Sequence, residues 1–209
     1  MNALILCIGL LAQFFYTSRI LVQWVQSERS RRIESPTLFW IFSVIGSILL
    51  CVYGCMRNDF AIVFGEFLSF YIYLWNLKIK GIYRHLPRWL SFLLPALPLV
   101  SLFYVLHDIP RFVADFLHNT DIPLYMLVWG TLGQVIFKFR FIYQWLHGVR
   151  HHTSDLPLTF WYIALTGSLI IISYGIYRHD IVIDIGQCSI FASIRNIIIG
   201  LRQGKEDRR

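Results

Sequence analysis

The chain has 209 residues, of which 56% are hydrophobic and only 15% are charged. Soluble proteins typically have roughly 45–50% apolar and about 25% charged residues, so this composition excludes an ordinary soluble domain. The net charge of +7 comes from basic residues dispersed between apolar segments, which does not suit a groove for nucleic acid. We therefore expect an integral membrane protein without a nucleic-acid partner.

Seven apolar segments have the length of about 20 residues that a membrane-spanning helix needs. In chain order they cover residues 3–26, 36–56, 60–80, 89–107, 123–147, 157–177 and 181–201. The connections at 57–59 and 178–180 are so short that we expect tight helical hairpins there. The first segment lacks a basic start and an Ala-x-Ala-like cleavage site, so we expect no cleavable signal peptide.

The basic residues between these segments predict how the chain is oriented in the membrane. Alternate connections place twelve of them on one side: Arg29, Arg31, Arg32, Lys78, Lys80, Arg84, Arg88, Arg150, Arg202, Lys205, Arg208 and Arg209. The other side receives Arg57, Arg111 and Arg178. Because the basic side faces the cytoplasm, we expect the amino terminus outside, or in the periplasm, and the carboxyl terminus in the cytoplasm.

An internal repeat appears when the sequence is shifted by 121 residues. Polar and aromatic positions recur: Gln13, Arg19, Gln23, Trp24, Pro36, Trp40 and Tyr53 fall on Gln134, Arg140, Gln144, Trp145, Pro157, Trp161 and Tyr174. With one residue of slippage, Asn76 meets Asn196. Such matches are far more specific than matches between leucines, and they indicate a duplicated three-helix unit.

The repeat predicts an all-α fold of two parallel three-helix bundles joined by a linker helix. Each unit has an odd number of spans, so the extra span at 89–107 is needed to give both units the same orientation. We expect a first repeat at 1–81, a linker helix and loop at 82–120, a second repeat at 121–202 and a tail at 203–209. Parallel repeats related by an axis along the membrane normal occur in transporters, although a purely structural bundle would have the same pattern.

Arginines at membrane depth are the first candidates for a functional site, because an ionisable group there is costly. Arg19 and Arg140 lie about 10 Å inside the membrane at 1.5 Å per residue, where snorkelling to the interface is an alternative explanation. Gln23 and Gln144 lie one turn further along the same faces. Together with Lys138 these residues predict one cationic cavity between the repeats, suited to phosphate.

Other polar and aromatic residues complete the predicted substrate-binding set. Glu66, which aligns with Gln187, is either a proton-coupling carboxylate or, as we favour, an ion-pair partner of an arginine. Trp24 and Trp145 could belong to an interfacial belt or stack on a sugar ring. The full set is Arg19, Gln23, Trp24, Glu66, Asn76, Lys138, Arg140, Gln144, Trp145, Arg195 and Asn196.

Two further groups of residues have simpler explanations. Trp40 and Trp161, each within about a turn of a helix start, suit an aromatic belt at the membrane interface. His147, His151 and His152 crowd one connection without a matched carboxylate or thiol cluster, so we expect no metal site. We also expect no cofactor and no catalytic residues, since no phosphate-binding glycine loop or nucleophile elbow is present.

The two repeats resemble a known family in the strings at 18–76 and 140–196. The shared pattern is R-x-x-x-Q-W, a basic loop, P-x-x-F-W, G-S, Y-G, R-x-D, G and a terminal Asn. It is similar to the domain at the amino terminus of some bacterial lipid-A-disaccharide synthases, here in two tandem copies. That domain looks like the PQ-loop group, with the SWEET and SemiSWEET sugar transporters, although Val22 and Tyr143 stand where the proline of the Pro-Gln motif would be.

The resemblance implies an inner-membrane protein of envelope glycolipid metabolism in a Gram-negative bacterium. Joined to the basic patch, it predicts a non-enzymatic translocator of a lipid-linked sugar, such as a polyprenyl-phosphate sugar or a lipid A-type glycolipid. One alternative is a SWEET-like facilitator of a free small sugar. Another is a membrane anchor that recruits a partner glycosyltransferase, and an oligomer is compatible with all three.

Overall fold

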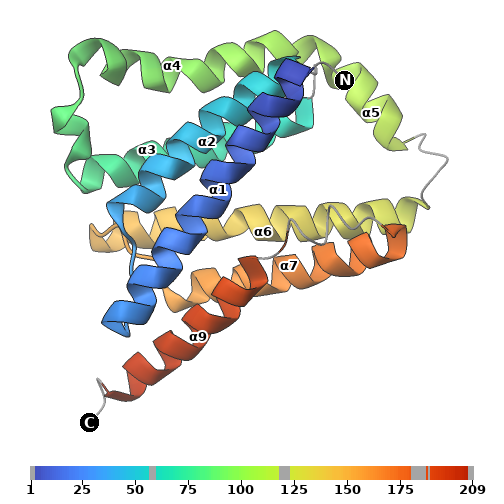
Figure 1. Cartoon of the computed structure of the whole chain (residues 1–209). Helices are drawn as coiled ribbons and strands as arrows, with labels where there is room; N and C mark the ends of the chain where they lie inside the picture. Colours follow the sequence, from blue (N-terminus) through green and yellow to red (C-terminus); the bar gives the residue numbers. More distant parts are fainter. Residues whose placement is uncertain (1–2, 57–59, 118–122, 180–186, 188, 207–209) are drawn as a thin grey trace. The chain divides into compact units, whose positions relative to one another are not determined.

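A computed structural model describes residues 3–56, 60–117, 123–179, 187 and 189–206 (Figure 1). Within these residues all regular structure is helical. The α-helices are α1 (Ala3–Ser30), α2 (Thr37–Met56), α3 (Phe60–Ile79), α4 (Arg88–Val105), α5 (Ile109–Leu117), α6 (Leu124–His151), α7 (Leu158–Arg178) and α9 (Ser189–Glu206). Short 3₁₀ turns cover Ile82–His85 and Leu106–Asp108. The predicted all-α class is confirmed. The connection predicted at 57–59 and residue 180 of the one predicted at 178–180 lie outside the described part.

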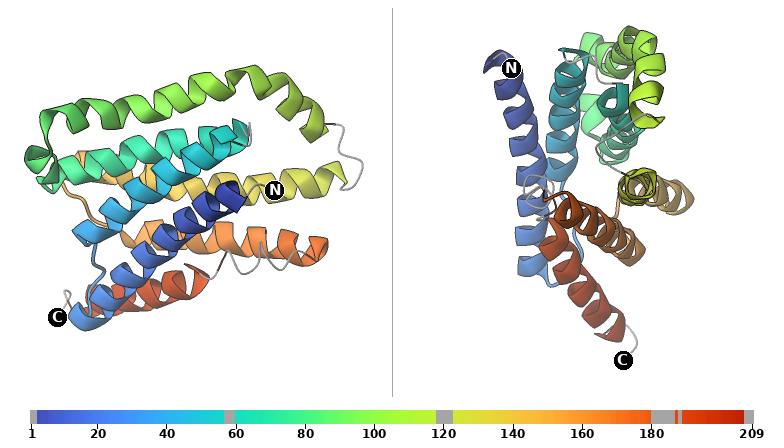
Figure 2. Two further views of the ribbon diagram at one scale, coloured as in Figure 1. Left: turned by 45° about the horizontal axis from the view of Figure 1, so that its top comes forward. Right: turned by 90° about the vertical axis from the view of Figure 1, so that its right-hand side faces the viewer.

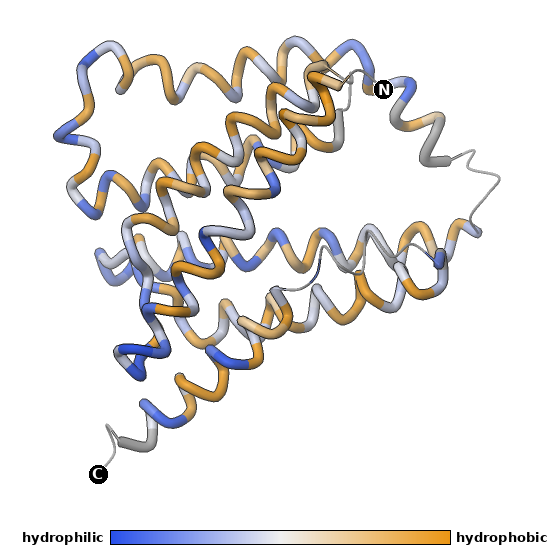
Figure 3. Tube along the Cα trace, viewed as in Figure 1, coloured by the Kyte–Doolittle hydropathy of each residue, from blue (hydrophilic) through white to orange (hydrophobic). Residues whose placement is uncertain are grey.

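Five helices in the described part are long and apolar enough to cross a membrane: α1, α2, most of α3, α4 with its extension to Arg111, and α7. Figure 3 shows long apolar stretches along α2 and α4 and polar interruptions in α6. The chain is therefore a membrane protein. The predicted spans at 123–147 and 181–201 correspond to α6 and α9, which are not among the five helices. In α6, Lys138, Arg140 and Gln144 lower the hydropathy, whereas the described α9 begins at Ser189, after most of residues 181–188, and ends in the charged residues Arg202, Lys205 and Glu206.

The chain forms two compact units that are described separately. Unit 1 comprises residues 1–19 and 37–118, and unit 2 comprises residues 20–36 and 119–209. In unit 1, α2 packs on α3, and α4 packs on both (Figure 1). In unit 2, α6 runs alongside α7, which also packs on α9 (Figure 2). The domain boundaries predicted from the repeat stay predictions, because these units are defined by contacts.

Equivalent glycines let equivalent aromatic rings approach closely in each copy of the repeat. A Cβ on Gly9 would lie 2.9 Å from the Tyr53 ring, and a Cβ on Gly130 would lie 2.8 Å from the Tyr174 ring. Close approach at small residues is how membrane helices gain packing energy when lipid offers no hydrophobic driving force. The repeat seen in the sequence is therefore also a repeat of helix-packing contacts inside each unit.

The helices α1 and α6 end in the same way at positions 121 residues apart. Arg31 follows α1 with φ of 57°, and His152 follows α6 with φ of 54°. The amide of His152 donates to the Gly148 carbonyl, as expected of a left-handed residue that caps a helix. Both positions are occupied by residues with a Cβ, for which this conformation costs about 1 kcal/mol or more.

We therefore expect Arg31→Gly and His152→Gly to raise the free energy of unfolding by a few tenths to about 1 kcal/mol each, after the loss of chain entropy is included. The matched controls are Arg29→Gly and Arg150→Gly, which lie inside the helices and should lower it by about 1 kcal/mol. Thermal unfolding in detergent measures all four variants. Shifts in the same direction at positions 29 and 31 would contradict the proposed strain.

Candidate functional site

Arg19 lies in unit 1 with only 6% of its surface exposed. Its Nη1 donates hydrogen bonds to Ser43 Oγ at 3.0 Å and to Tyr73 Oη at 3.2 Å. The guanidinium also lies over the Tyr16 ring, 4.4 Å from the centroid. Aromatic faces attract a cation that has left water, so hydroxyl groups and rings together hold this charge inside the helices.

Glu66 is a second buried charged group of unit 1, at 2% exposure. Its Oε2 accepts hydrogen bonds from Tyr16 Oη and from Ser47 Oγ, the latter at 2.9 Å. Arg19 and Glu66 therefore meet at one tyrosine, with the cation over the ring and the carboxylate at the hydroxyl. Hydrogen bonds of this kind are needed because a buried charge without them is very costly.

Arg140 occupies the position equivalent to Arg19 and lies in unit 2 at 4% exposure. It lies over the rings of Phe137, Phe141 and Phe160 at 3.6, 4.9 and 5.3 Å from their centroids. Phe137 is the repeat counterpart of Tyr16. The enclosure of an arginine by aromatic rings is therefore a shared property of both copies.

The second copy carries a neutral group where the first carries a carboxylate. Ser168 Oγ donates to Gln187 Oε1 at 3.1 Å, and these two residues are the counterparts of Ser47 and Glu66. Both copies thus have a hydrogen bond from the serine hydroxyl to the side chain at this position, but only the first copy has a carboxylate there. This difference, together with Lys138 in place of Thr17, makes the two copies electrostatically unequal.

Gln23 and Gln144 are fully buried and both lie in unit 2. Their amide nitrogens donate to the backbone carbonyl eleven residues further on, Glu34 at 3.2 Å and Asp155 at 3.1 Å. Each glutamine thereby fixes the connection that follows its own helix. A residue chosen as a ligand candidate from sequence thus has a structural role in both copies.

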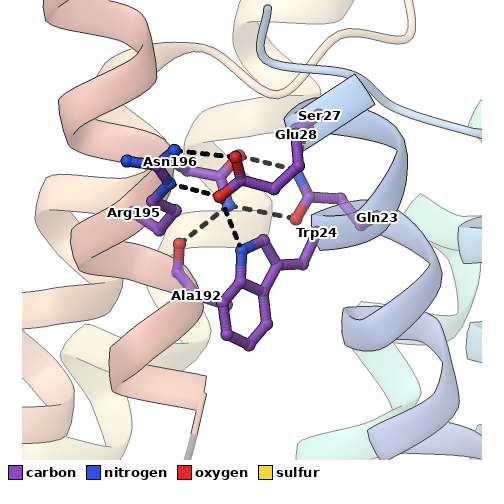
Figure 4. Close-up of polar contacts among 7 residues, drawn as sticks. All are labelled: Gln23, Trp24, Ser27, Glu28, Ala192, Arg195 and Asn196. Carbon is purple, nitrogen blue, oxygen red and sulfur yellow. Dashed lines mark hydrogen bonds and ion pairs between the residues drawn. The ribbon is translucent and has the colours of Figure 1, made fainter. Parts of the chain in front are cut away.

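The end of α1 in unit 2 makes a dense group of polar contacts with α9 (Figure 4). Gln23 and Asn196 exchange two hydrogen bonds, Gln23 Nε2 to Asn196 Oδ1 at 2.8 Å and Asn196 Nδ2 to Gln23 Oε1 at 3.1 Å. Arg195 donates two hydrogen bonds to the Glu28 carboxylate, from Nε to Oε1 and from Nη2 to Oε2, the latter at 2.7 Å. The Trp24 indole nitrogen donates to Glu28 Oε1 at 3.2 Å.

The remaining predicted site residues lie in different surroundings. Asn76 is fully buried in unit 1 and donates to the Ile72 carbonyl at 2.8 Å, as Asn196 does to Ala192 at 2.7 Å. Lys138 is half-buried, whereas Trp145 is exposed in unit 2. Within the units, the structure thus brings together Arg19 with Glu66, and Gln23 and Trp24 with Arg195 and Asn196. The single cavity for Arg19 and Arg140 stays a prediction.

Sequence reasoning missed several residues that the structure places in these contacts. Tyr16, Ser43 and Tyr73 around Arg19 carry no distinctive signal of their own. Glu28 could have been found, because Val149 stands at its repeat position, while Trp75 stands at that of Arg195. Two opposite charges that both depart from the repeat are a recognisable signal of an ion pair.

Two tryptophans do not have the environment that we predicted. Trp40 is fully buried and Trp161 is 4% exposed. Each packs edge-on against the preceding phenylalanine, with ring centroids 4.8 Å and 5.0 Å apart. They are core residues, and the interpretation as an interfacial belt is wrong for both.

Comparison with known proteins identifies the family. The model described as "Lipid A Biosynthesis N-terminal domain" matches residues 8–78 and 129–198, which are the two copies of the repeat. The chain is 32% identical over 196 residues to a lipid-A-disaccharide synthase of Chlamydia pneumoniae, covering 91% of this chain and 32% of that protein. The synthase of Chlamydia abortus is 31% identical over 202 residues, which cover 92% and 32% of the two chains. No solved structure matches.

These relatives contradict one expectation and confirm another. The prediction that the chain is not an enzyme is wrong, because its relatives are named as a synthase. That prediction used the absence of catalytic motifs, yet the chain spans only about a third of the length of the curated relatives it matches. The predicted resemblance is confirmed: the chain belongs to the lipid A biosynthesis N-terminal domain family and contains two tandem copies of the domain.

Proposed function

We propose that this chain acts in lipid A disaccharide synthesis by binding a phosphate-bearing glycolipid within the membrane and moving the lipid-linked sugar across it. The observation that carries the proposal is the buried arginine at the same position of each copy, Arg19 and Arg140, each enclosed by aromatic rings. A guanidinium can bind two phosphate oxygens at once. A free neutral sugar would require no such cation.

The proposal includes an arrangement in the membrane. The two copies are parallel three-helix bundles joined along the chain by α4 as the linker helix, in the inner membrane of a bacterium, with the amino terminus in the periplasm. Its support is the hydropathy of the helices and the asymmetry of the basic connections. Arg19 in the first copy and Arg140 with Lys138 in the second are the proposed phosphate ligands. The connections rich in arginine lie on the cytoplasmic side, as the positive-inside rule expects.

The test is binding of a lipid A-type phosphoglycolipid to the protein in reconstituted vesicles. Arg19→Gln and Arg140→Gln should each weaken binding about tenfold or more, because a lost charge-assisted hydrogen bond costs about 1.5–3 kcal/mol. Arg29→Gln and Arg150→Gln are matched controls, since they lie on the same two helices, at equivalent positions, and are exposed. They should change binding by less than about threefold, as expected of surface charges.

Three outcomes separate this proposal from its alternatives. Weakened phosphoglycolipid binding only in the buried-arginine variants, with flipping of the lipid by the wild type, supports it. Saturable uptake of a free sugar, with unchanged handling of every phosphate-bearing lipid tried, would indicate a facilitator instead. Neither activity, together with a glycosyltransferase that co-purifies through the basic connections, would indicate an anchor.

A further inference from the structure

The contacts between α1 and α9 in unit 2 form two layers, which we call the clasp: Gln23, Trp24, Glu28, Arg195 and Asn196 (Figure 4). The inner layer is the amide pair of Gln23 and Asn196, and both residues are fully buried. The outer layer is the ion pair of Glu28 and Arg195, whose side chains are each 36% exposed. The charged layer is thus the one that solvent and dissolved ions can reach.

The amide nitrogens of the inner layer have both of their hydrogens engaged while the clasp is closed. Gln23 Nε2 lies within hydrogen-bond distance of Ser27 Oγ at 2.9 Å, of the Glu34 carbonyl at 3.2 Å and of Asn196 Oδ1 at 2.8 Å. The Asn196 amide nitrogen is shared between Gln23 and the Ala192 carbonyl. A ligand could therefore accept hydrogen bonds from these amide nitrogens only after the two helix ends separate.

The outer ion pair can occur only once in this duplicated chain. At the positions of Glu28 and Arg195 the other copy has Val149 and Trp75, whereas Gln23 and Asn196 recur as Gln144 and Asn76. The charged layer is therefore a property of the α1–α9 contact alone, whereas the residues of the inner layer occur in both copies.

We propose that the clasp is a latch that an anionic ligand opens. In the closed state the Glu28 carboxylate occupies the place of the ligand on Arg195. An anionic ligand that binds Arg195 displaces Glu28, the ends of α1 and α9 separate, and the buried amides of Gln23 and Asn196 become accessible. The chemistry fits because a guanidinium can donate two parallel hydrogen bonds either to a carboxylate or to a phosphate. The identity of the ligand as a phosphoglycolipid rests on the proposed function. The latch itself rests only on the contacts of unit 2.

The latch is tested by the accessibility of a buried cysteine. Ser27→Cys is introduced into a protein in which Cys7, Cys51, Cys55 and Cys188 are replaced by alanine, and its modification by a polar thiol reagent is timed in permeable vesicles. Ser27 is fully buried in the closed clasp. Ser193→Cys, also at a fully buried position on α9, is a second reporter, and the exposed Gln26→Cys is the control.

Without ligand, Glu28→Gln and Arg195→Gln should each raise the modification rate of the buried reporter several-fold. The exchanged pair, Glu28→Arg with Arg195→Glu, should return the modification rate of the buried reporter to within about twofold of the parent's rate. The modification rate of the control cysteine at position 26 should stay constant in all variants. Rising salt should speed modification in the parent but not in Glu28→Gln, because only the parent has an ion pair to screen. Unchanged rates in both single variants at both reporters, or no recovery in the exchanged pair, would overturn the latch.

A second arm adds the phosphoglycolipid and measures its binding in the same vesicles. The rate should rise in the parent and not further in Glu28→Gln, while a neutral glycolipid should have no effect. If the phosphoglycolipid binds but leaves the modification rate of the parent protein unchanged, the proposal that the ligand opens the latch is wrong, and the proposed function is unaffected. Absence of binding, with the expected changes in the ligand-free variants, refutes the proposed function and supports the latch as a contact.

Discussion

Replacing Trp40 by alanine should lower the free energy of unfolding by about 3 kcal/mol. Truncating a buried aromatic side chain costs about 3–5 kcal/mol in soluble proteins. We expect the lower end of this range because lipid tails are as apolar as the helix core, so that lost packing dominates. Trp40 is fully buried, and its ring lies 4.8 Å from Phe39 and 6.2 Å from Tyr73. Titration of the protein in mixed micelles with a denaturing detergent, followed by circular dichroism, measures the loss.

Trp161→Ala should have a similar effect, because Trp161 has the same edge-on contact with Phe160 at 5.0 Å. The matched control is Trp145→Ala, since Trp145 is 37% exposed in unit 2. It should cost well under about 1 kcal/mol, as surface substitutions usually do. Equal losses for Trp145 and Trp161 would contradict the assignment of Trp161 to the core.

Removing the hydroxyl of Tyr16 should destabilise the protein by about 1–3 kcal/mol, since a buried charged acceptor then loses a donor. In Tyr16→Phe the Glu66 carboxylate keeps the hydrogen bond from Ser47 but no longer receives the one from Tyr16. The cost is expected to be large because a partly satisfied buried carboxylate is poorly stabilised by its surroundings. The same unfolding titration measures it.

The second copy of the repeat indicates how this cost can be reduced. It has Phe137 and Gln187 where the first copy has Tyr16 and Glu66, so phenylalanine at the first position is combined with a neutral amide at the second. We therefore expect Tyr16→Phe to cost less in a Glu66→Gln background, with a coupling energy of at least about 0.5 kcal/mol. Strictly additive effects of the two substitutions would show that the tyrosine does not stabilise the charge of Glu66.

The sequence by itself determined the all-helical class and the duplication. Runs of about 20 apolar residues must satisfy their own backbone hydrogen bonds in a membrane, and a helix does so within one segment. Recurrence of Arg19 at Arg140 and of Gln23 at Gln144 identified the two copies that the family model also matches. These features are local or periodic, and they are therefore visible without knowing which helices meet.

The tertiary structure decided which side chains share an environment. Glu28 and Arg195 are 167 residues apart, and nothing along either helix specifies the partner. Trp40 and Trp161 lie near helix starts, where a belt residue and a core residue have the same sequence pattern, and only the packing of neighbouring helices separates the two. Burial and long-range hydrogen bonds depend on how the faces of different helices meet. Residues three or four positions apart lie on the same face of one helix, and the sequence shows this directly. The partner of a side chain on another helix can come from anywhere in the chain, so only the tertiary structure identifies it.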